Sequence, residues 1–355
     1  MIQMQDVNYL SIQTLCTMLD NASHISIVSH MKPDGDALGS CLAMYSYAVM
    51  CGKECSIVLP HNYPSNLSFL ISSECAENIA IHEDEPQKAL DLIGASDLII
   101  CLDFNAFHRA DLLCSALESS KAAKILIDHH LNPDREAFDL VFSETEVSSA
   151  SELLYHILMA TPRIDGDAAK LPTCAINALM TGMTTDTNNF ANSVYPSTLQ
   201  MASGLLAAGA DRDFILLNIY NMFSENRLRL LGLILKDLMV ITGNGVAYIV
   251  LDSQTLRRYN ISEGDTEGFV NMPLSIKDVR MSLLLKEDGN RVRVSIRSKK
   301  GTSANRCARK YFNGGGHENA AGGRLMIPDD IADITSAAAY IEKYTERFFN
   351  EENEH

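Results

Sequence analysis

The first half of the chain contains short, almost wholly apolar runs separated by stretches with helical periodicity. Four of these runs span residues 24–29, 54–59, 97–102 and 124–127. Strands inside a parallel sheet are buried on both faces, so they read as continuous apolar runs rather than alternating ones. Because helical patterns separate the runs, the sequence predicts an α/β fold with a doubly wound, mainly parallel sheet.

Two helical patterns flank the first predicted strand. Residues 7–20 are amphipathic, and residues 37–50 are followed by Gly52, a residue type that commonly ends a helix. In doubly wound sheets, ligands bind beyond the carboxyl ends of the strands. Polar residues that directly follow the apolar runs are therefore the first candidates for a functional site.

The second half of the chain predicts a smaller α/β unit after a mainly helical stretch at 148–241. The expected strands are 246–251, 279–286 and 291–298. The last two form a hairpin that turns through 287–290, and a glycine-rich loop at 314–316 precedes a final helix near 333–350.

Chain length favours two domains. At roughly 150 residues per domain, 355 residues correspond to about two. We place the first domain at 1–210, a connector at 211–230, and the second domain at 231–355.

Composition is that of a globular protein with a sizeable core, with 46% apolar and 21% charged residues. The sequence has no apolar run of the ~20 residues that a membrane-spanning helix needs. Its start lacks the basic and apolar regions of a secretory signal. The nine cysteines form no CxxC pair, so we expect free thiols in a cytoplasmic protein that does not bind membranes.

The net charge of −16 argues against a general attraction for long nucleic acid. Residues 291–310 nevertheless hold eight Lys or Arg and no Asp or Glu. On a strand at 291–298, Arg291, Arg293, Ser295 and Arg297 would share one face. The segment predicts either a solvated charged face or a local binding surface for short anionic ligands.

Potential metal ligands follow four of the predicted elements. They are His30, Asp34, Asp36, Asp103, Asp128, His129, His130 and Asp186. Carboxylates and imidazoles suit Mn²⁺, and carboxylates suit Mg²⁺. Two cations about 3.5–4 Å apart need a bridging carboxylate and lower the pKa of a water held between them. The set therefore predicts two-metal hydrolysis of a phosphate ester.

Each of these residues also has a simpler interpretation. One Asp after a strand is often only a helix cap, and two adjacent histidines can lie in a turn. We expect Asp34 and Asp36 to point the same way from an extended segment, with Gly35 allowing an unusual turn between them. The occurrence of all four groups at the ends of strands or helices favours the metal site.

The motifs His30-x₃-Asp34-x-Asp36, Asp103, Asp128-His129-His130 and Asp186, in this order, resemble those of the DHH phosphoesterase superfamily. Gly314-Gly-Gly-His317 and Ser295-Ile-Arg297 resemble the signatures of its DHHA1 substrate-binding domain. The resemblance covers nearly the whole chain. It is strongest to the oligoribonuclease and pAp-phosphatase branch (NrnA-like, RecJ-related), where pAp is 3′-phosphoadenosine-5′-phosphate.

The resemblance implies a role for each residue of the DHH domain. His30, Asp34 and Asp103 would hold one Mn²⁺, and Asp36, Asp103, His129 and Asp186 the other, with Mg²⁺ or another divalent cation left open. Asp103 would bridge the two cations. Asp128 would orient a neighbouring ligand, and His130 would face the scissile phosphate. These three residues would form the catalytic set.

The resemblance also implies a substrate site in a smaller α/β DHHA1 domain across a cleft. The residues concerned are Arg109, Arg297, Gly315, Gly316 and His317. Glycines before a helix start let backbone N–H groups approach an anion, which agrees with this assignment. The segment after Asp186 lacks the Gly and Arg that this branch often has, which leaves the fine substrate preference open.

The implied function is hydrolysis of short oligoribonucleotides to 5′-mononucleotides, removal of the 3′-phosphate of pAp, or both. The expected partners are short RNA or small nucleotides, without long duplexes, and a homodimer is left open. The alternatives are an exopolyphosphatase-like enzyme and a phosphodiesterase for linear or cyclic dinucleotides. A nucleotide sensor without catalysis is disfavoured by the intact set of ligand residues.

Overall fold

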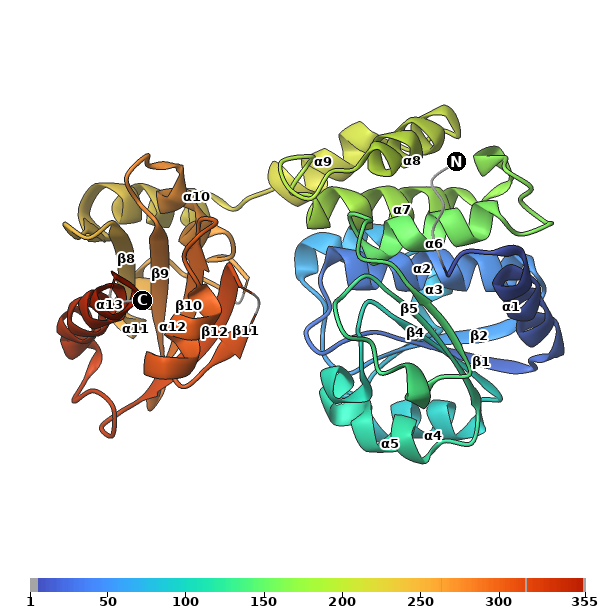
Figure 1. Cartoon of the computed structure of the whole chain (residues 1–355), viewed down its shortest axis with the longest axis horizontal. Helices are drawn as coiled ribbons and strands as arrows, with labels where there is room; N and C mark the ends of the chain where they lie inside the picture. The colour runs from blue at the N-terminus through green and yellow to red at the C-terminus, as the bar shows by residue number, and fades with distance from the viewer. Residues whose placement is uncertain (1–5, 263, 317, 354–355) are drawn as a thin grey trace. The chain divides into compact units, whose positions relative to one another are not determined.

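The computed structural model describes residues 6–262, 264–316 and 318–353 (Figure 1). The chain divides between Met222 and Phe223 into two compact units. This division falls inside the expected connector 211–230, which contains most of two helices, α9 (Arg212–Tyr220) and α10 (Glu225–Leu233). Across the described ranges, no helix is both long and apolar enough to cross a membrane.

The first unit is built on a six-stranded sheet whose order is β3-β2-β1-β4-β5-β6. Every pairing in it is parallel. The strands are β1 (His24–Val28), β2 (Glu54–Leu59), β3 (Ile79–Ile81), β4 (Leu98–Leu102), β5 (Ala123–Asp128) and β6 (Leu140–Ser143). The predicted doubly wound sheet is confirmed, and the two short edge strands β3 and β6 are additions to it.

Helices cover both faces of this sheet (Figure 1). Alternate residues of one strand enter different cores: Ile25 and Ile27 of β1 pack on one side, and Val28 on the other. The first side carries α1 (Tyr9–Asn21), α2 (Gly35–Met50), α3 (Ser73–Ala76), α6 (Ala150–Met159), α7 (Thr173–Asp186), α8 (Pro196–Ala207) and α9. The second side carries α4 (Pro86–Ala95), the 3₁₀ segment η2 (Phe107–Leu113) and α5 (Cys114–Ser119). Burial on both faces explains the continuous apolar runs.

The strand order reverses at β1, where the chain moves outward through β2 and β3 and then returns to β4 on the other side. Ligands of doubly wound sheets bind at this kind of switch point, beyond the carboxyl ends of the strands. The segments that follow β1, β4 and β5 therefore meet at one edge of the sheet.

The second unit contains a mixed sheet with the order β11-β12-β10-β9-β8-β7. Only the β8–β9 pairing is parallel. The strands are β7 (Met239–Ile241), β8 (Val246–Leu251), β9 (Met281–Asp288), β10 (Arg291–Ser298), β11 (Gly315–Gly316) and β12 (Ala320–Met326). The predicted β9–β10 hairpin is confirmed, and the turn itself is Gly289-Asn290.

Two separate cores pack against this sheet. The inward residues of β10 pack with α12 (Ala304–Tyr311) and α13 (Ala337–Asn353) on one face. The other face carries α10, α11 (Ser253–Arg258) and the 3₁₀ segment η6 (Phe269–Ser275). Burial alternates along β10, as the sequence predicts for Arg291, Arg293, Ser295 and Arg297 on one face.

The expected helix start after the glycine-rich loop is wrong. Gly315 and Gly316 form β11 and pair with Gly322 and Ala321 of β12. Glycine is depleted in strands, which is why β12, with the sequence AAGGRLM, gives no strand signal. A helix dipole therefore does not act at these glycines.

Candidate functional site

The predicted metal ligands of the first unit converge at the carboxyl edge of its sheet. His30 follows β1, Asp103 follows β4 and His129 follows β5, which are neighbouring strands. Asp36 lies in the first turn of α2, and Asp186 is the last residue of α7. Five elements thus bring imidazoles and carboxylates within a few ångströms of each other.

Asp103 lies at the centre of this group. Its Oδ2 is 3.4 Å from Nε2 of His30, and its Oδ1 is 3.5 Å from Nε2 of His129. The residue is buried, and its φ of 63° places it in the left-handed region that non-glycine residues rarely adopt. This backbone conformation costs energy, and such costs concentrate at functional sites. The carboxylate faces a different histidine with each oxygen.

His30 is oriented by its own backbone surroundings. Its Nδ1 lies 2.8 Å from the carbonyl oxygen of Met31, which accepts the Nδ1 proton. Nε2 is then the nitrogen that faces Asp103 and Asp34, whose Oδ1 is 4.0 Å away. Metal-binding histidines commonly have one nitrogen fixed by a carbonyl in this way.

His129 belongs to a second group of carboxylates. Its Nε2 lies 3.7 Å from Oδ2 of Asp186 and 4.0 Å from Oδ2 of Asp36. The described residues thus include two sets whose ligand atoms lie within 4.8 Å of one another, His30–Asp34–Asp103 and Asp36–His129–Asp186. A third set joins Asp103 to His129 and His130. Asp103 therefore links the two sides of the site.

The expected extended geometry of Asp34 and Asp36 is wrong. Asp34 is the N-cap of α2, and its Oδ1 accepts hydrogen bonds from the backbone N–H groups of Asp36 and Ala37. Asp36 is already helical. Gly35 does not provide an unusual turn either: a Cβ at this position would lie within 3 Å of the Thr185 side chain. Close packing of α2 against α7 requires the glycine.

Asp36 is held by the start of α6, which the sequence did not suggest. Its Oδ2 accepts from the N–H of Ala150 at 2.6 Å, and its Oδ1 accepts from the N–H of Ser151 at 2.9 Å. Helix N-termini stabilise anions. The signal available in the sequence was the capping pattern Ser149-x-x-Glu152; the Ser149 hydroxyl accepts from the N–H of Glu152.

Asp128 orients His130 rather than His129. Its Oδ1 lies 2.7 Å from Nδ1 of His130, and its Oδ2 accepts from the His130 backbone N–H. Asp128 is fully buried at the end of β5. The contact places the Nδ1 proton of His130 against a carboxylate, which fixes the ring and leaves Nε2 for another partner.

The charges of the centre favour bound cations. Burial alone would lower the histidine pKa values, but the contact with Asp103 raises the pKa of His30 to about 9 and that of His129 to about 10. Despite burial, these two histidines hold the pKa of Asp103 well below its usual range. Burial and the charges of Asp103 and Asp34 raise the pKa of Asp186 to about 6.

The residues present fit divalent cations. Oδ1 of Asp103 is buried and accepts no hydrogen bond from the described residues, and a buried acceptor without a partner is costly. The donors are carboxylate oxygens and imidazole nitrogens, the combination that suits Mn²⁺. These residues can hold a divalent metal, and a cation would satisfy the Asp103 oxygen while replacing the protons of His30 and His129.

Arg109 lies in η2, partly buried. Its carbonyl oxygen accepts a hydrogen bond of 2.7 Å from the N–H of Met31, next to His30. The structure thus brings the Arg109 backbone to the loop that carries the first metal ligand. Its role in substrate binding stays a prediction.

Arg297 lines a hollow of about 380 Å³ in the second unit. Lys286, Arg293 and Ser295 line the same hollow, together with the segment 264–270 of the opposite wall. The Arg297 guanidinium donates to the carbonyl oxygens of Ile296 and Ala321, and burial lowers its pKa. No carboxylate of the described residues forms an ion pair with it.

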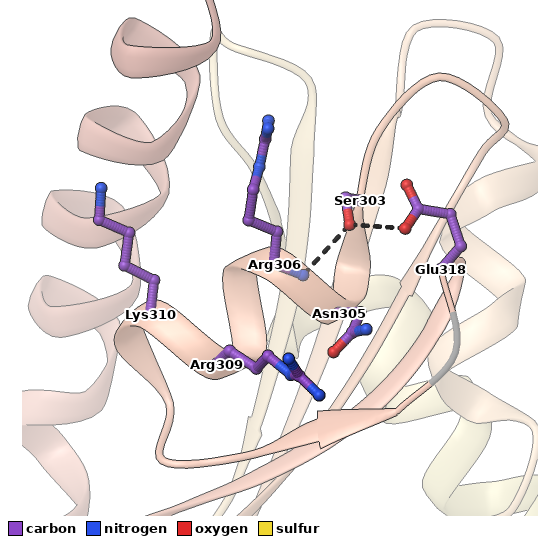
Figure 2. A pocket seen from close by; sticks show the side chains of 6 residues that line it. All are labelled: Ser303, Asn305, Arg306, Arg309, Lys310 and Glu318. Carbon is purple, nitrogen blue, oxygen red and sulfur yellow. Dashed lines mark hydrogen bonds between the residues drawn. The ribbon is translucent and has the colours of Figure 1, made fainter.

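Gly315 and Gly316 do not line this hollow. The nearest side chains to a Cβ built at Gly315 would be Arg309 and Asn305 of α12, on the opposite face of the sheet. Figure 2 shows Arg309 and Asn305 in a second hollow of about 500 Å³, which Ser303, Arg306, Lys310 and Glu318 also line. The predicted residue His317 lies outside the described residues.

Comparison with known families agrees with this fold and centre. The model of the DHH family, N-terminal domain, matches residues 24–183, and the DHHA1 domain matches residues 243–343. Each match lies within one of the two units, and the first contains most of the predicted metal ligands. The chain is a phosphoesterase of the DHH family, and it combines a DHH domain with a DHHA1 domain.

Three individual relatives indicate which branch of the family this chain resembles. The chain is 27% identical to the bifunctional oligoribonuclease and PAP phosphatase NrnA of Bacillus subtilis, over 85% of this chain and 89% of that protein. A crystal structure of an exopolyphosphatase-related protein from Bacteroides fragilis has 34% identity, 98% coverage of both chains and a TM-score of 0.89. The cyclic-di-AMP phosphodiesterase GdpP of Geobacillus thermodenitrificans is 29% identical, but only over 55% of this chain and 29% of that protein. The chain therefore belongs to the NrnA-like branch of the DHH/DHHA1 family.

Proposed function

We propose that this chain is a Mn²⁺-dependent phosphoesterase that hydrolyses short oligoribonucleotides to 5′-mononucleotides and removes the 3′-phosphate of pAp. The observation that carries the proposal is Asp103, a buried carboxylate that faces His30 with one oxygen and His129 with the other. Resemblance to NrnA over most of both chains supports the substrate class.

In this proposal His30, Asp34 and Asp103 hold one cation, and Asp36, Asp103, His129 and Asp186 hold the other. Two such cations, when bound, activate a water and stabilise the negative charge of the attacked phosphoryl group. The Asp103 carboxylate would be shared by both cations, since its buried Oδ1 accepts no hydrogen bond from the described residues. The α6 N-terminus keeps Asp36 in place before a cation arrives.

His130 meets the substrate rather than a cation. Because Asp128 accepts the Nδ1 proton, Nε2 of His130 exchanges a proton with the scissile phosphate or the leaving oxygen. The pair is a positioned general acid beside the cation ligands.

In this proposal the second unit also contributes to substrate binding. Arg297 is half-buried, lacks an acidic partner among the described residues, and is suited to a phosphate because guanidinium groups bind phosphate oxygens in pairs. Gly315, Gly316 and His317 remain candidates for the same substrate. The net charge of −16 disfavours long nucleic acid and so agrees with a short ligand.

A substrate panel with Mn²⁺ tests the proposal. It contains pAp, oligoribonucleotides of two to five residues, a cyclic dinucleotide, polyphosphate and a nitrophenyl phosphodiester. We expect turnover of pAp and the linear oligoribonucleotides, with 5′-mononucleotides as products. Turnover of polyphosphate alone would support the exopolyphosphatase alternative, and hydrolysis of none of the esters would indicate a sensor.

A further inference from the structure

Glu152 is a carboxylate that lies fully buried in the first turn of α6. Its Oε2 accepts three hydrogen bonds: from the Ser148 N–H at 2.9 Å, from the Ser148 hydroxyl, and from the Thr198 hydroxyl at 2.7 Å. Its Oε1 lies 3.7 Å from Nε2 of His156. Burial would raise the pKa of Glu152, but the contact with His156 and the hydroxyl donors around it lower that pKa to about 2. The buried group is therefore ionised at neutral pH.

Glutamate is almost never fully buried unless it is paired, because an ionised group loses its hydration on burial. Among the described residues, no Lys or Arg forms an ion pair with Glu152. Hydrogen bonds from Ser148 and Thr198 therefore offset most of the cost, and they fix these two residues to the carboxylate.

The start of α6 serves two carboxylates at once. In a capping box, a Glu in the first turn accepts from the backbone N–H of the N-cap residue. Here Glu152 accepts from Ser148, the residue before the N-cap Ser149. The N–H groups of the first two helical residues, Ala150 and Ser151, remain for another acceptor, and both donate to Asp36.

The position of the Asp36 carboxylate therefore depends on the backbone of residues 148–152. Asp36 is 1% exposed, and it belongs to the cation set that contains His129 and Asp186. The first N–H groups of a helix have no partners within the helix, so contacts with other groups decide where they lie. Glu152 provides such contacts directly behind the two N–H groups that hold Asp36.

Glu152 also joins α6 to the start of α8. The Thr198 hydroxyl that donates to Glu152 accepts in turn from the N–H of Tyr195 at 3.0 Å. Tyr195 is the N-cap of α8, and α8 follows α7, whose last residue is Asp186. One carboxylate thus connects the helix that holds Asp36 to the helix that comes after Asp186 in the chain.

The first cation set is held by other elements. His30 is oriented by the carbonyl oxygen of Met31, and Asp34 accepts from the N–H groups at the start of α2. None of these hydrogen bonds involves residues 148–152. A change at Glu152 should therefore act on one cation site and not on the other.

We propose that Glu152 is a positioning residue for the second cation site: it holds the start of α6 so that Ala150 and Ser151 keep the Asp36 carboxylate in place. The inference rests on the proposed function for the presence of two cations. Groups that orient a metal ligand without touching the metal typically change metal affinity by 10- to 100-fold when they are lost.

The test compares variants of the full chain. Glu152→Met removes the acceptor, and Glu152→Gln keeps one oxygen that can accept. The matched control is Asp97→Ala, because Asp97 accepts from the N–H groups of Ser23 and His24 at the opposite edge of the sheet. Binding of Mn²⁺ to the metal-free proteins is measured by calorimetry, and Asp186→Asn identifies the second site. Thermal unfolding verifies that each variant folds.

Glu152→Met should bind the second Mn²⁺ about 10- to 100-fold more weakly and the first like the wild type. Glu152→Gln should recover most of this loss, and Asp97→Ala should bind both cations like the wild type. If Glu152→Met does not fold, Thr198→Val, which removes one donor, should show a smaller loss at the same site.

Several results would overturn the positioning role. They are an equal loss at both cation sites, the same loss in Asp97→Ala, no loss in any variant of this contact, and binding of only one Mn²⁺ by the wild type. A loss in Glu152→Gln as large as in Glu152→Met would assign the effect to the charge rather than to the hydrogen bonds, and would also overturn it.

Hydrolysis is measured separately. The kcat of Glu152→Met should rise toward that of the wild type as the Mn²⁺ concentration increases, with an unchanged KM for the substrate. A raised KM at saturating Mn²⁺ would contradict an effect confined to the cation site. If Glu152→Met loses only the second Mn²⁺ but the wild type hydrolyses no substrate, the proposed function fails while the positioning role stands.

Discussion

The two units carry opposite charges on different parts of their sheets: carboxylates beyond the strand ends in the first, and cations on a sheet face in the second. In the first unit both sheet faces are covered by helices, and the carboxylates Asp36, Asp103 and Asp186 crowd together beyond the strand ends. In the second unit part of one face is open, and cations lie along and across its strands. The first arrangement is suited to cations, and we propose that the second binds an anionic substrate.

We infer that the first unit carries out hydrolysis and that the second unit selects the substrate. The acidic centre is buried and tied to backbone amides, as at Asp36, so its geometry is fixed before a ligand binds. The basic face is partly exposed, and its side chains are long and adaptable. We therefore expect changes in the first unit to act on kcat and changes in the second to act on KM.

The largest effect is expected from a change of Asp103, the proposed bridging carboxylate of the first unit. Asp103→Asn keeps the shape but removes the charge that faces both histidines, so kcat should fall by about 1,000-fold or more, from the several kcal/mol that bound cations supply. Metal content per chain, measured by mass spectrometry, should fall with it. Activity near that of the wild type would refute the shared site.

His130 separates ligation from catalysis within the first unit. His130→Ala should lower kcat by at least about 100-fold, as expected for a lost general acid, and leave the metal content unchanged. Asp128→Asn should act in the same direction, because Asp128 holds the ring through Nδ1. A metal-free His130→Ala protein would instead identify His130 as a ligand.

The sequence predicted site residues well where a single polar residue directly follows an apolar strand. His30, Asp103 and His129 were predicted from their positions after apolar runs, and the parallel sheet brings them together. The short strands β3 and β6 were missed because three or four residues give little pattern. β12 was missed because two of its seven residues are glycine.

The sequence was uninformative where tertiary contact decides. Asp34 and Asp36 were expected in an extended segment, yet Asp34 caps α2, which begins at Gly35 and packs closely against α7 at this residue. Asp36 is held by α6, more than a hundred residues away. Likewise, Arg324 gives no signal in the sequence, since only the register of β10 with β12 places it beside Arg293.

The variant Arg297→Ala tests whether the second unit selects the substrate. Arg297→Ala should raise KM for pAp and oligonucleotides by about 10- to 100-fold, the value of a lost hydrogen bond to a charged group. KM for a nitrophenyl phosphodiester should change little. Arg291→Ala is the matched control, because Arg291 lies on the same face of β10 but is paired with Asp288. Equal effects of Arg297→Ala on all substrates would remove its role in selection.

The smallest effect concerns pH and distinguishes the metal-free from the metal-bound centre. With pKa values near 9 for His30 and 10 for His129, both imidazoles are protonated at neutral pH, and cations must displace these protons. Apparent metal affinity should therefore rise with pH, by about tenfold per unit for each proton displaced. Titration with Mn²⁺ in weak buffer should release up to two protons, fewer after His30→Ala.

The stability of the metal-free protein should fall as pH rises, whereas metal affinity should rise. A histidine pKa above its ordinary value of 6.5 stabilises the fold fully below that pH, and the contribution disappears as pH rises through about 9 to 10. The unfolding temperature measured in EDTA should therefore fall over the pH range in which metal affinity rises. A metal affinity that stays constant between about pH 6 and 8 would show that the two histidines are not the groups that cations displace.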